Sequence, residues 1–213
     1  MRTPPETDRR RDAERTRADI LEVATEEFAT HGYSGARVDE IAARTRTTKR
    51  MIYYYFGGKE QLYLSVLERA YAEIRAAERA VDVDHLDPVS AIRRIAEVTF
   101  DHHEAHPWFI KLVGAENAQQ GRHMNDVAGL VDLNSSAVDM LTGVLERGRA
   151  QGLFRDDVDA LDVHMMISAF CFFRVANRHT FGAIFGRDLL DPGTREHHRT
   201  MVADMVAGYL SRR

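Results

Sequence analysis

The amino-acid sequence predicts an all-α protein, and three observations lead to that class. Apolar residues recur three and four positions apart along most of the chain, which is the period of an amphipathic helix. Glycine and proline stand mainly between these periodic segments, where they end one helix or begin the next. No stretch shows the alternating pattern and short turn of a β-hairpin. We therefore expect about nine helices.

The N-terminal quarter predicts an arm followed by three helices. Residues 1–12 are charged, contain two prolines and hold almost no apolar side chains, so we expect a disordered basic arm. The helical period then runs from about residue 13 to 30, and Gly32 suits the left-handed position just beyond a helix end. A short helix begins near Val38, and the Thr48 hydroxyl can cap a third helix.

The rest of the chain predicts six longer helices separated by loops. The periodic segments cover about 59–80, 88–106, 107–120, 129–150, 159–178 and 194–211. Pro88 and Pro107 stand at helix starts, where the missing amide proton is not needed. Gly121 ends the segment 107–120.

Composition is that of an ordinary soluble protein, with 44% hydrophobic and 29% charged residues. The first residues contain no secretory apolar region, and the longest mostly apolar run, 165–173, is shorter than the roughly 20 residues that span a bilayer. Cys171 is the only cysteine, so an internal disulfide is impossible. We expect a cytoplasmic protein with no membrane partner.

The third helix divides its side chains between two faces. In "KRMIYYYFGGKE", residues 49–60, one helical side holds Met51, Ile52, Tyr55 and Phe56, which we expect to pack inward. The other side holds Lys49, Arg50, Tyr53 and Tyr54, which we expect to project outward. Residues 41–59 contain five basic residues and no acid, although the net charge of the chain is −4. Such a basic island is typical of a phosphate-facing surface, but charge alone fits a solvated face equally well.

Residues 20–68 resemble the DNA-binding segment of the TetR/AcrR family of transcriptional regulators. The family pattern is an amphipathic helix ending in F-x-x-x-G-Y, then I-A, then K-x-x-[ILM]-Y-x-[YH]-F, then K-E. The matching residues, in register, are Phe28, Gly32, Tyr33, Ile41, Ala42, Lys49, Ile52, Tyr53, Tyr55, Phe56, Lys59 and Glu60. Two residues depart from the pattern: Arg46 replaces a permissive turn residue, and Ala36 replaces a capping threonine.

The resemblance implies a helix-turn-helix DNA-binding domain over 13–58 and a regulatory, ligand-binding and dimerisation domain over 59–213. The third helix would lie in the major groove of double-stranded operator DNA. The predicted DNA-contacting residues are Arg37, Arg46, Thr47, Thr48, Lys49, Arg50, Tyr53, Tyr54 and Lys59. Arg50 can pair with guanine, and Lys59 suits a phosphate at a helix N-terminus. We expect Arg46 to adopt a strained turn backbone and to gain a phosphate contact.

The segment 159–178 is apolar on nearly every side and predicts a subunit interface. Such a helix must be covered all round, and a domain of this size rarely encloses one completely. The alternative is the central helix of a monomer. The resemblance implies that this helix and the last one form the interface of a homodimer. The predicted interface residues are Met165, Phe172, Val202, Met205, Val206 and Tyr209.

Polar residues among apolar ones on three later helices predict a site for a small-molecule effector. The predicted lining residues are Phe100, His103, Trp108, Phe109, Leu112, Glu116, Asn117, Phe170, Arg174, Asn177 and Arg178. Either arginine could hold a carboxylate and either aromatic residue of 108–109 could stack on a ring. For each polar residue, an internal hydrogen bond or ion pair explains the sequence equally well.

The sequence therefore predicts a ligand-responsive repressor that binds a palindromic operator as a dimer, without a cofactor and without enzymatic activity. Two alternatives stay open. One is a DNA-binding protein that answers to no effector. The other is a metal-dependent helical enzyme that uses His102, His103 and His106, although spacing supplies no further ligand and we expect no metal.

Overall fold

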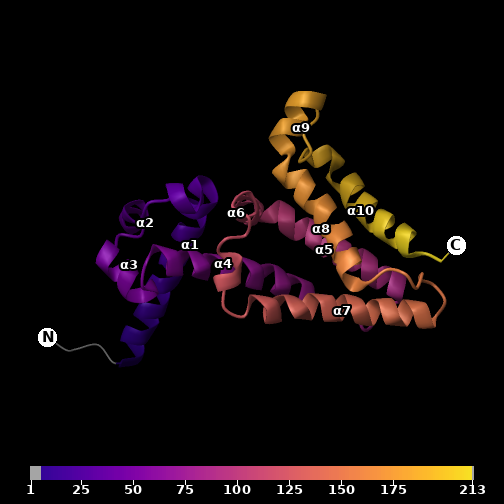
Figure 1. Ribbon diagram of the computed structural model, residues 1–213, viewed down its shortest axis with the longest axis horizontal. Helices are drawn as coiled ribbons and strands as arrows, with labels where there is room; N and C mark the ends of the chain where they lie inside the picture. Colours follow the sequence, from indigo (N-terminus) through magenta and orange to yellow (C-terminus); the bar gives the residue numbers. More distant parts are fainter. Residues whose placement is uncertain (1–5, 213) are drawn as a thin grey trace. The chain divides into compact units, whose positions relative to one another are not determined.

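The computed structural model describes the backbone of residues 6–212 and the side chains of residues 11–212. Within this range the regular secondary structure is helical, as predicted, apart from one isolated β-bridge between Phe154 and Ser211. The helices are α1 (Glu6–Gly35), α2 (Val38–Arg44), α3 (Lys49–Phe56), α4 (Lys59–Arg79), α5 (Pro88–Ala105), α6 (Pro107–Ala118), α7 (Leu130–Ala150), α8 (Ala160–Ala176), α9 (Arg178–Phe185) and α10 (Arg195–Leu210) (Figure 1). No helix in the described range is long and apolar enough to cross a membrane.

Two elements differ from the sequence predictions. α1 begins at Glu6, so residues 6–12 of the expected disordered arm are helical, while residues 1–5 lie outside the described range. The glutamate and arginine residues of this segment have high helix propensity, which favours extending a helix that already forms downstream. The second difference is α9, which the prediction left as part of a loop. Asn177 ends α8, and the chain turns there and resumes as a separate eight-residue helix.

The described chain forms two compact units. Unit 1 consists of the chain up to Ala70 together with Lys111–Ala128, and unit 2 consists of Tyr71–Ile110 and the chain from Gly129 onward. The predicted domain boundary at residue 58 stays a prediction. The unit that contains the first three helices also includes the first part of α4 and most of α6.

Unit 1 has a core between α1, α2, α3 and the start of α4. Its fully buried side chains include Phe28 from α1, Ile41 from α2 and Ile52 from α3. Gly32 has a φ of 65° and forms a kink near the end of α1, so it provides the positive-φ turn that the sequence predicts after about residue 30. The Tyr33 ring then packs on Tyr63 of α4, with ring centroids 5.2 Å apart.

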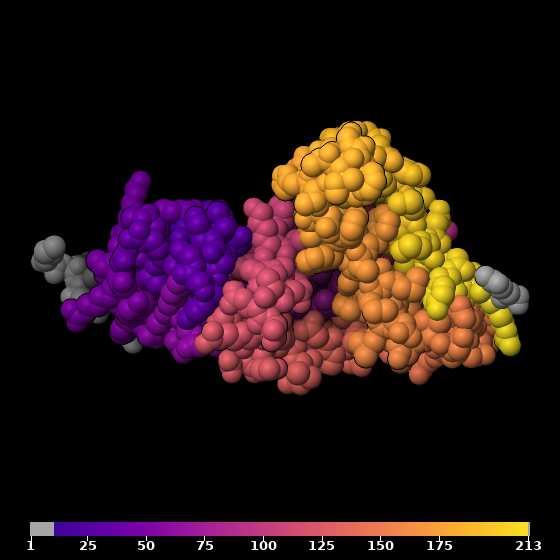
Figure 2. All heavy atoms as spheres, turned by 45° about the horizontal axis from the view of Figure 1, so that its top comes forward, coloured from indigo at the N-terminus to yellow at the C-terminus, as the bar shows by residue number. Residues whose placement is uncertain are grey.

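Unit 2 has a core between α5, α7, α8 and α10. Its buried cluster is mostly aliphatic and includes Ile92, Leu145, Ile167 and Val206. Figure 2 shows α9 and the segment that follows it, in gold, as a lobe that stands out from the rest of this unit. α10 packs against both α5 and α8, so two of its faces are occupied within the same chain.

Candidate functional site

α3 has one buried and one exposed face, as the sequence predicts. Ile52 and Phe56 are buried, whereas Tyr53 and Tyr54 are 39% and 78% exposed. Tyr55 is half-buried. Met51 was expected to point inward but is 37% exposed. At about 100° per residue, Met51 lies roughly 120° from the centre of the buried pair, so it falls on the flank of the helix.

The backbone conformation of the turn before α3 depends on Thr48 and Arg46. The Thr48 hydroxyl accepts a hydrogen bond from the Met51 amide at 3.2 Å, which confirms the predicted cap. Arg46 has a φ of 53°, the left-handed conformation that its departure from the family pattern predicts. The amide of Thr47 donates to the Ala42 carbonyl at 3.0 Å. Together these bonds fix where α3 begins relative to α2.

The start of α2 is capped by a side chain from another helix. Arg37 occupies the N-cap position and makes no side-chain cap of its own. Its amide donates instead to the Glu27 carboxylate of α1 at 3.1 Å. Glu27 is only 6% exposed. Glu27 therefore performs the capping that Ala36 lacks the side chain to perform.

Cations on the surface of unit 1 differ in their freedom to bind phosphate. Arg37, Arg46 and Arg50 are exposed and make no side-chain hydrogen bond or ion pair among the described residues. The Lys49 ammonium lies 3.3 Å from the Asp39 carboxylate in an exposed pair, which contributes little and is readily exchanged for phosphate. Lys59 is half-buried, with its ammonium 5.0 Å from the centre of the Tyr33 ring and 3.5 Å from the Ser34 carbonyl. Burial lowers the pKa of Lys59.

Glu116, predicted to line a ligand site, instead belongs to a buried network inside unit 1. One carboxylate oxygen accepts from the Tyr63 hydroxyl at 2.8 Å and lies 2.9 Å from His123 Nδ1. The other accepts from the His123 amide at 3.1 Å. Burial opposes ionisation, but these hydrogen bonds outweigh it and lower the pKa of Glu116. Leu112 is fully buried in the same unit and Asn117 is exposed.

His103 and Phe109 meet inside unit 2, in a cluster of aromatic and imidazole rings. Phe109 lies 5.6 Å from His103 and 5.5 Å from Tyr71, centroid to centroid, and Trp108 lies 6.4 Å from Phe109. The His102 ring stacks on His106 at 4.2 Å. Among the described residues, no group of three or more histidines, cysteines or carboxylates is arranged to hold a metal ion.

The same cluster contains a buried ion pair that sequence reasoning missed. Arg75 and Glu78 of α4 pair with each other and are 4% and 3% exposed. Arg75 Nε and both ring nitrogens of His102 have no hydrogen-bond partner among the described residues. Burial lowers the pKa of His102 to about 3 and that of His103 to about 4, so both rings are neutral near pH 7. The sequence did contain a sign of this buried pair. Arg75 and Glu78 are three positions apart and lie beside Ile74, on the apolar side of the helix.

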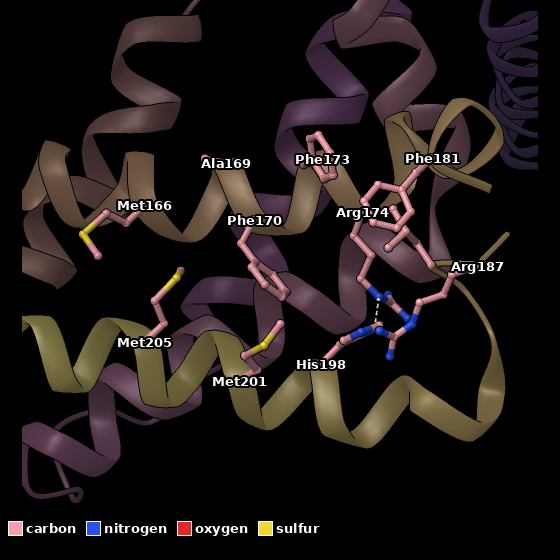
Figure 3. A pocket seen from close by; sticks show the side chains of 11 residues that line it. Met166, Ala169, Phe170, Phe173, Arg174, Phe181, Arg187, His198, Met201 and Met205 are labelled. Carbon is pink, nitrogen blue, oxygen red and sulfur yellow. Dashed lines mark hydrogen bonds between the residues drawn. The ribbon is translucent and has the colours of Figure 1, made fainter. Parts of the chain in front are cut away.

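A pocket of about 630 Å³ lies between α8, α9 and α10 of unit 2 (Figure 3). Two of the predicted effector residues, Phe170 and Arg174, line it. The other lining residues are Met166, Ala169, Phe173, Phe181, Arg187, Leu189, His198, Met201 and Met205. Phe100 lies beneath Arg174, whose guanidinium carbon is 4.2 Å from the ring centre. The contribution of α9 could not be foreseen, because the helix itself was not predicted.

Asn177 and Arg178, the last two predicted effector residues, do not line this pocket. Asn177 forms the junction between α8 and α9. Arg178 is exposed and makes a two-pronged ion pair with Asp188, at 2.6 and 2.8 Å. The hydrogen bonds from Arg178 lower the pKa of Asp188 to about 2. This ion pair connects the segment that follows α9 to the first residue of α9.

The predicted dimer residues divide between an exposed face and the core of unit 2. Met165, Met205 and Tyr209 are 63%, 40% and 45% exposed, and Phe172 is half-buried. Val202 and Val206 are fully buried in their own chain, so assigning them to the interface was wrong. They follow Met201 and Met205 by one residue, which turns them about 100° around α10 and toward the core.

Comparison with known proteins covers both units. Residues 20–66 match the family model described as bacterial regulatory proteins, tetR family, and residues 88–206 match the tetracyclin repressor-like C-terminal domain. HTH-type transcriptional repressor NicS of Pseudomonas putida is 37% identical over 204 residues, which is 96% of either chain. HTH-type transcriptional repressor SCO4008 of Streptomyces coelicolor is 41% identical over 111 residues, 52% of this chain and 54% of that protein. The solved structure of SCO4942 from the same species is 30% identical, with a TM-score of 0.70 over 93% of this chain and 99% of that one.

Proposed function

The chain belongs to the TetR family of bacterial regulatory proteins, and from this premise we propose that it is a repressor that binds a palindromic operator as a homodimer and releases it on binding a small effector. It is a DNA-binding transcriptional regulator. The proposed site of action is the cytoplasm, where the DNA is. The observation that carries the proposal is the exposed face of α3, where Arg50, Tyr53 and Tyr54 project from a helix whose other face is buried.

The proposed DNA contacts follow from the position of each side chain. Lys49 and Arg50 stand in the first turn of α3, the end of a recognition helix that meets base edges in the major groove. Arg50 makes no competing ion pair within the described chain, so it is available to pair with guanine. Thr48 keeps a hydroxyl proton to donate to phosphate while its oxygen caps the helix. Lys59 is a weaker candidate, because its ammonium already contacts Tyr33.

The proposed homodimer uses the exposed apolar residues of α8 and α10. Leu161 and Met165 of α8 and Met205 and Tyr209 of α10 are each at least 40% exposed. α8 and α10 pack on each other, and exposed apolar side chains gathered on neighbouring helices are typical of interaction sites. A palindromic operator requires two recognition helices at successive major grooves, about 34–36 Å apart, and a dimer with two-fold symmetry has the symmetry that such a site requires.

The proposed response to an effector needs only a modest difference in affinity. An effector releases DNA if it binds the DNA-free arrangement better than the DNA-bound one. A coupling free energy of about 1–3 kcal/mol changes operator affinity roughly 5- to 150-fold. An effector that binds both arrangements equally well would have no influence on operator occupancy.

The test is a gel-shift titration of the purified protein on the DNA upstream of its own gene, with Tyr53→Ala, Lys49→Ala and the control Lys111→Ala. Lys111 is an exposed lysine of unit 1 on α6, outside α3. We expect both α3 variants to lose the shift while their melting temperatures stay close to that of the parent, because both side chains are exposed. Lys111→Ala should bind as the parent does. An unfolded Tyr53→Ala protein, or a shift that survives both changes, would contradict the proposed interface.

A further inference from the structure

The pocket between α8, α9 and α10 has an apolar wall and a cationic end. Met166 and Phe170 on α8 face Met201 and Met205 on α10 across the pocket, as Figure 3 shows. Its volume of about 630 Å³ lies within the range of roughly 300–1,000 Å³ that is usual for small-molecule sites. Methionine side chains are flexible and polarizable, so this wall can adapt to ligands of different shape.

The cationic end holds a buried donor that lacks a partner. Arg174 is 3% exposed; its Nη1 pairs with Glu104, and its Nε lies 3.4 Å from His198 Nδ1. Its Nη2 has no hydrogen-bond partner among the described residues. In Figure 3 the side-chain nitrogens of Arg174, Arg187 and His198 converge at this end of the pocket.

The carboxylates near this end are already shared among other arginines. Glu104 binds both Arg174 and Arg195, and Asp101 binds both Arg195 and Arg199. Arg187 is exposed and makes no ion pair or hydrogen bond with any described residue. Among the residues that line the pocket, Arg174 and Arg187 carry charge and both are cations, so no carboxylate lines this end.

His198 adds no charge to this end at neutral pH. Burial and the nearby guanidinium groups of Arg174 and Arg187 lower its pKa. Arg174 and Arg187 both line this end of the pocket. An anion placed there would accept from Arg174 Nη2 and would offset the repulsion between the guanidinium groups.

We propose that this pocket binds an amphiphilic carboxylate, with the carboxylate between Arg174 and Arg187 and the apolar body along Met166, Phe170 and Met201. A neutral ligand of the same shape would leave the buried Nη2 donor unpaired, and a cationic one would add repulsion. The role of this carboxylate as the effector rests on the proposed function. Its binding to the pocket can be tested independently of that function.

The mouth of the pocket adjoins the face proposed for dimerisation, because Met205 belongs to both. A second copy seated on α8 and α10 would cover this mouth and enclose a bound ligand. Side chains of the second copy would compete with a ligand for the pocket. The experiment must therefore use the full chain at concentrations where its mass is known from sedimentation.

The experiment is calorimetric titration of the full chain with decanoate, below its micelle concentration, beside 1-decanol and decyltrimethylammonium as matched uncharged and cationic probes. Arg187→Gln is the test variant and Arg94→Gln is the control, since Arg94 is an exposed arginine of α5 that does not line the pocket. We expect saturable decanoate binding, about tenfold or more weaker in Arg187→Gln because a charge-assisted contact is lost, and unchanged in Arg94→Gln. Met201→Asp, which puts a carboxylate in the wall, should also abolish it.

Three results would overturn the proposed site: no saturable binding, equal binding to all three probes, or equal binding by the parent and Arg187→Gln. No saturable binding is also the result expected if a second copy fills the pocket. A gel shift with the ligand-free protein separates the two proposals. If the ligand-free protein does not bind the operator, the proposed function is refuted but the proposed pocket is not. If decanoate binds the protein but never releases the operator, its role as effector is refuted.

Discussion

The two units each bury a cluster of polar side chains, and the clusters differ in completeness. In unit 1, Tyr63, Glu116 and His123 meet, and both carboxylate oxygens of Glu116 accept hydrogen bonds. In unit 2, Arg75 and His102 lie in a cluster where Arg75 Nε and both imidazole nitrogens of His102 have no partner in the described chain. Both clusters are almost completely shielded from water.

The contrast teaches where the molecule is fixed and where it can rearrange. A buried network whose members are all paired specifies one arrangement, because every alternative breaks hydrogen bonds in a medium of low dielectric. Unpaired buried groups cost free energy, so an alternative arrangement that pairs them is within reach. We infer that unit 1 is held in a single arrangement around Glu116, whereas the α4–α5 contact of unit 2 has room to change.

The largest expected effect comes from breaking the complete cluster. Glu116→Ala leaves the Tyr63 hydroxyl and two donors of His123 buried without an acceptor, so it should lower the free energy of unfolding by about 4 kcal/mol. Urea unfolding measures this. The matched variant Tyr63→Phe removes one donor and keeps the shape, and it should cost only about 1 kcal/mol. Equal losses in the two variants would contradict the expectation that Glu116 holds more of the cluster together than Tyr63 does.

The second effect concerns the incomplete cluster. Arg75→Met leaves the buried Glu78 carboxylate without its ion-pair partner, and we expect a loss of about 3 kcal/mol in the free energy of unfolding. The double variant Arg75→Met/Glu78→Leu removes both charges and the unpaired Nε, so it should recover parental stability or exceed it. Failure of the second substitution to rescue the first would mean that Arg75 stabilises unit 2 through contacts other than this pair.

The third effect is a dependence on pH that the same cluster causes. The unfolded chain binds a proton at His102 below about pH 6.5, while the folded chain excludes it until the pKa near 3. Stability is therefore full above pH 6.5 and falls as the pH drops. Between pH 7.5 and 5.5 this histidine should cost about 1.4 kcal/mol. His102→Phe should reduce the pH dependence by that amount.

The smallest effect tests the one strained backbone position next to α3. Glycine adopts the left-handed conformation of Arg46 without the cost of a side chain, so Arg46→Gly should stabilise unit 1 by about 0.5 kcal/mol after its own entropy cost. If Arg46 contacts a phosphate, the variant should bind operator with a log–log salt slope lower by about 1. An unchanged slope would remove the phosphate contact.

Local patterns predicted the face of α3 and its cap because the information lies within one or two helical turns. The spacing of Ile52 and Phe56 and the hydroxyl of Thr48 are enough to orient that helix. Met51 was misplaced because it lies on the edge of the buried arc, where a pattern of three and four is ambiguous. The long-range partners were out of reach: Tyr63 and Glu116 are 53 residues apart and have no pattern in common.

The candidate ligand site was predicted least well, for two physical reasons. Periodicity identifies a helix face that is apolar but does not say which neighbour covers it, so Val202 and Val206 were assigned to a partner instead of to α5. Glu116 and Arg174 both resemble polar groups in an apolar cavity when seen in sequence. Only the folded chain shows that one is fully paired and that the other keeps a free donor.

The Glu27 carboxylate of α1 accepts a hydrogen bond from the amide of Arg37, the N-cap residue of α2, so the start of α2 depends on a side chain of α1. α2 has seven residues and no hydroxyl or carboxylate of its own at the N-cap, so nothing local nucleates it. A synthetic peptide of residues 36–60 should consequently be largely unstructured by circular dichroism, although it contains all of α3, the proposed recognition helix. We therefore expect the proposed recognition helix to form only in a chain that also contains α1.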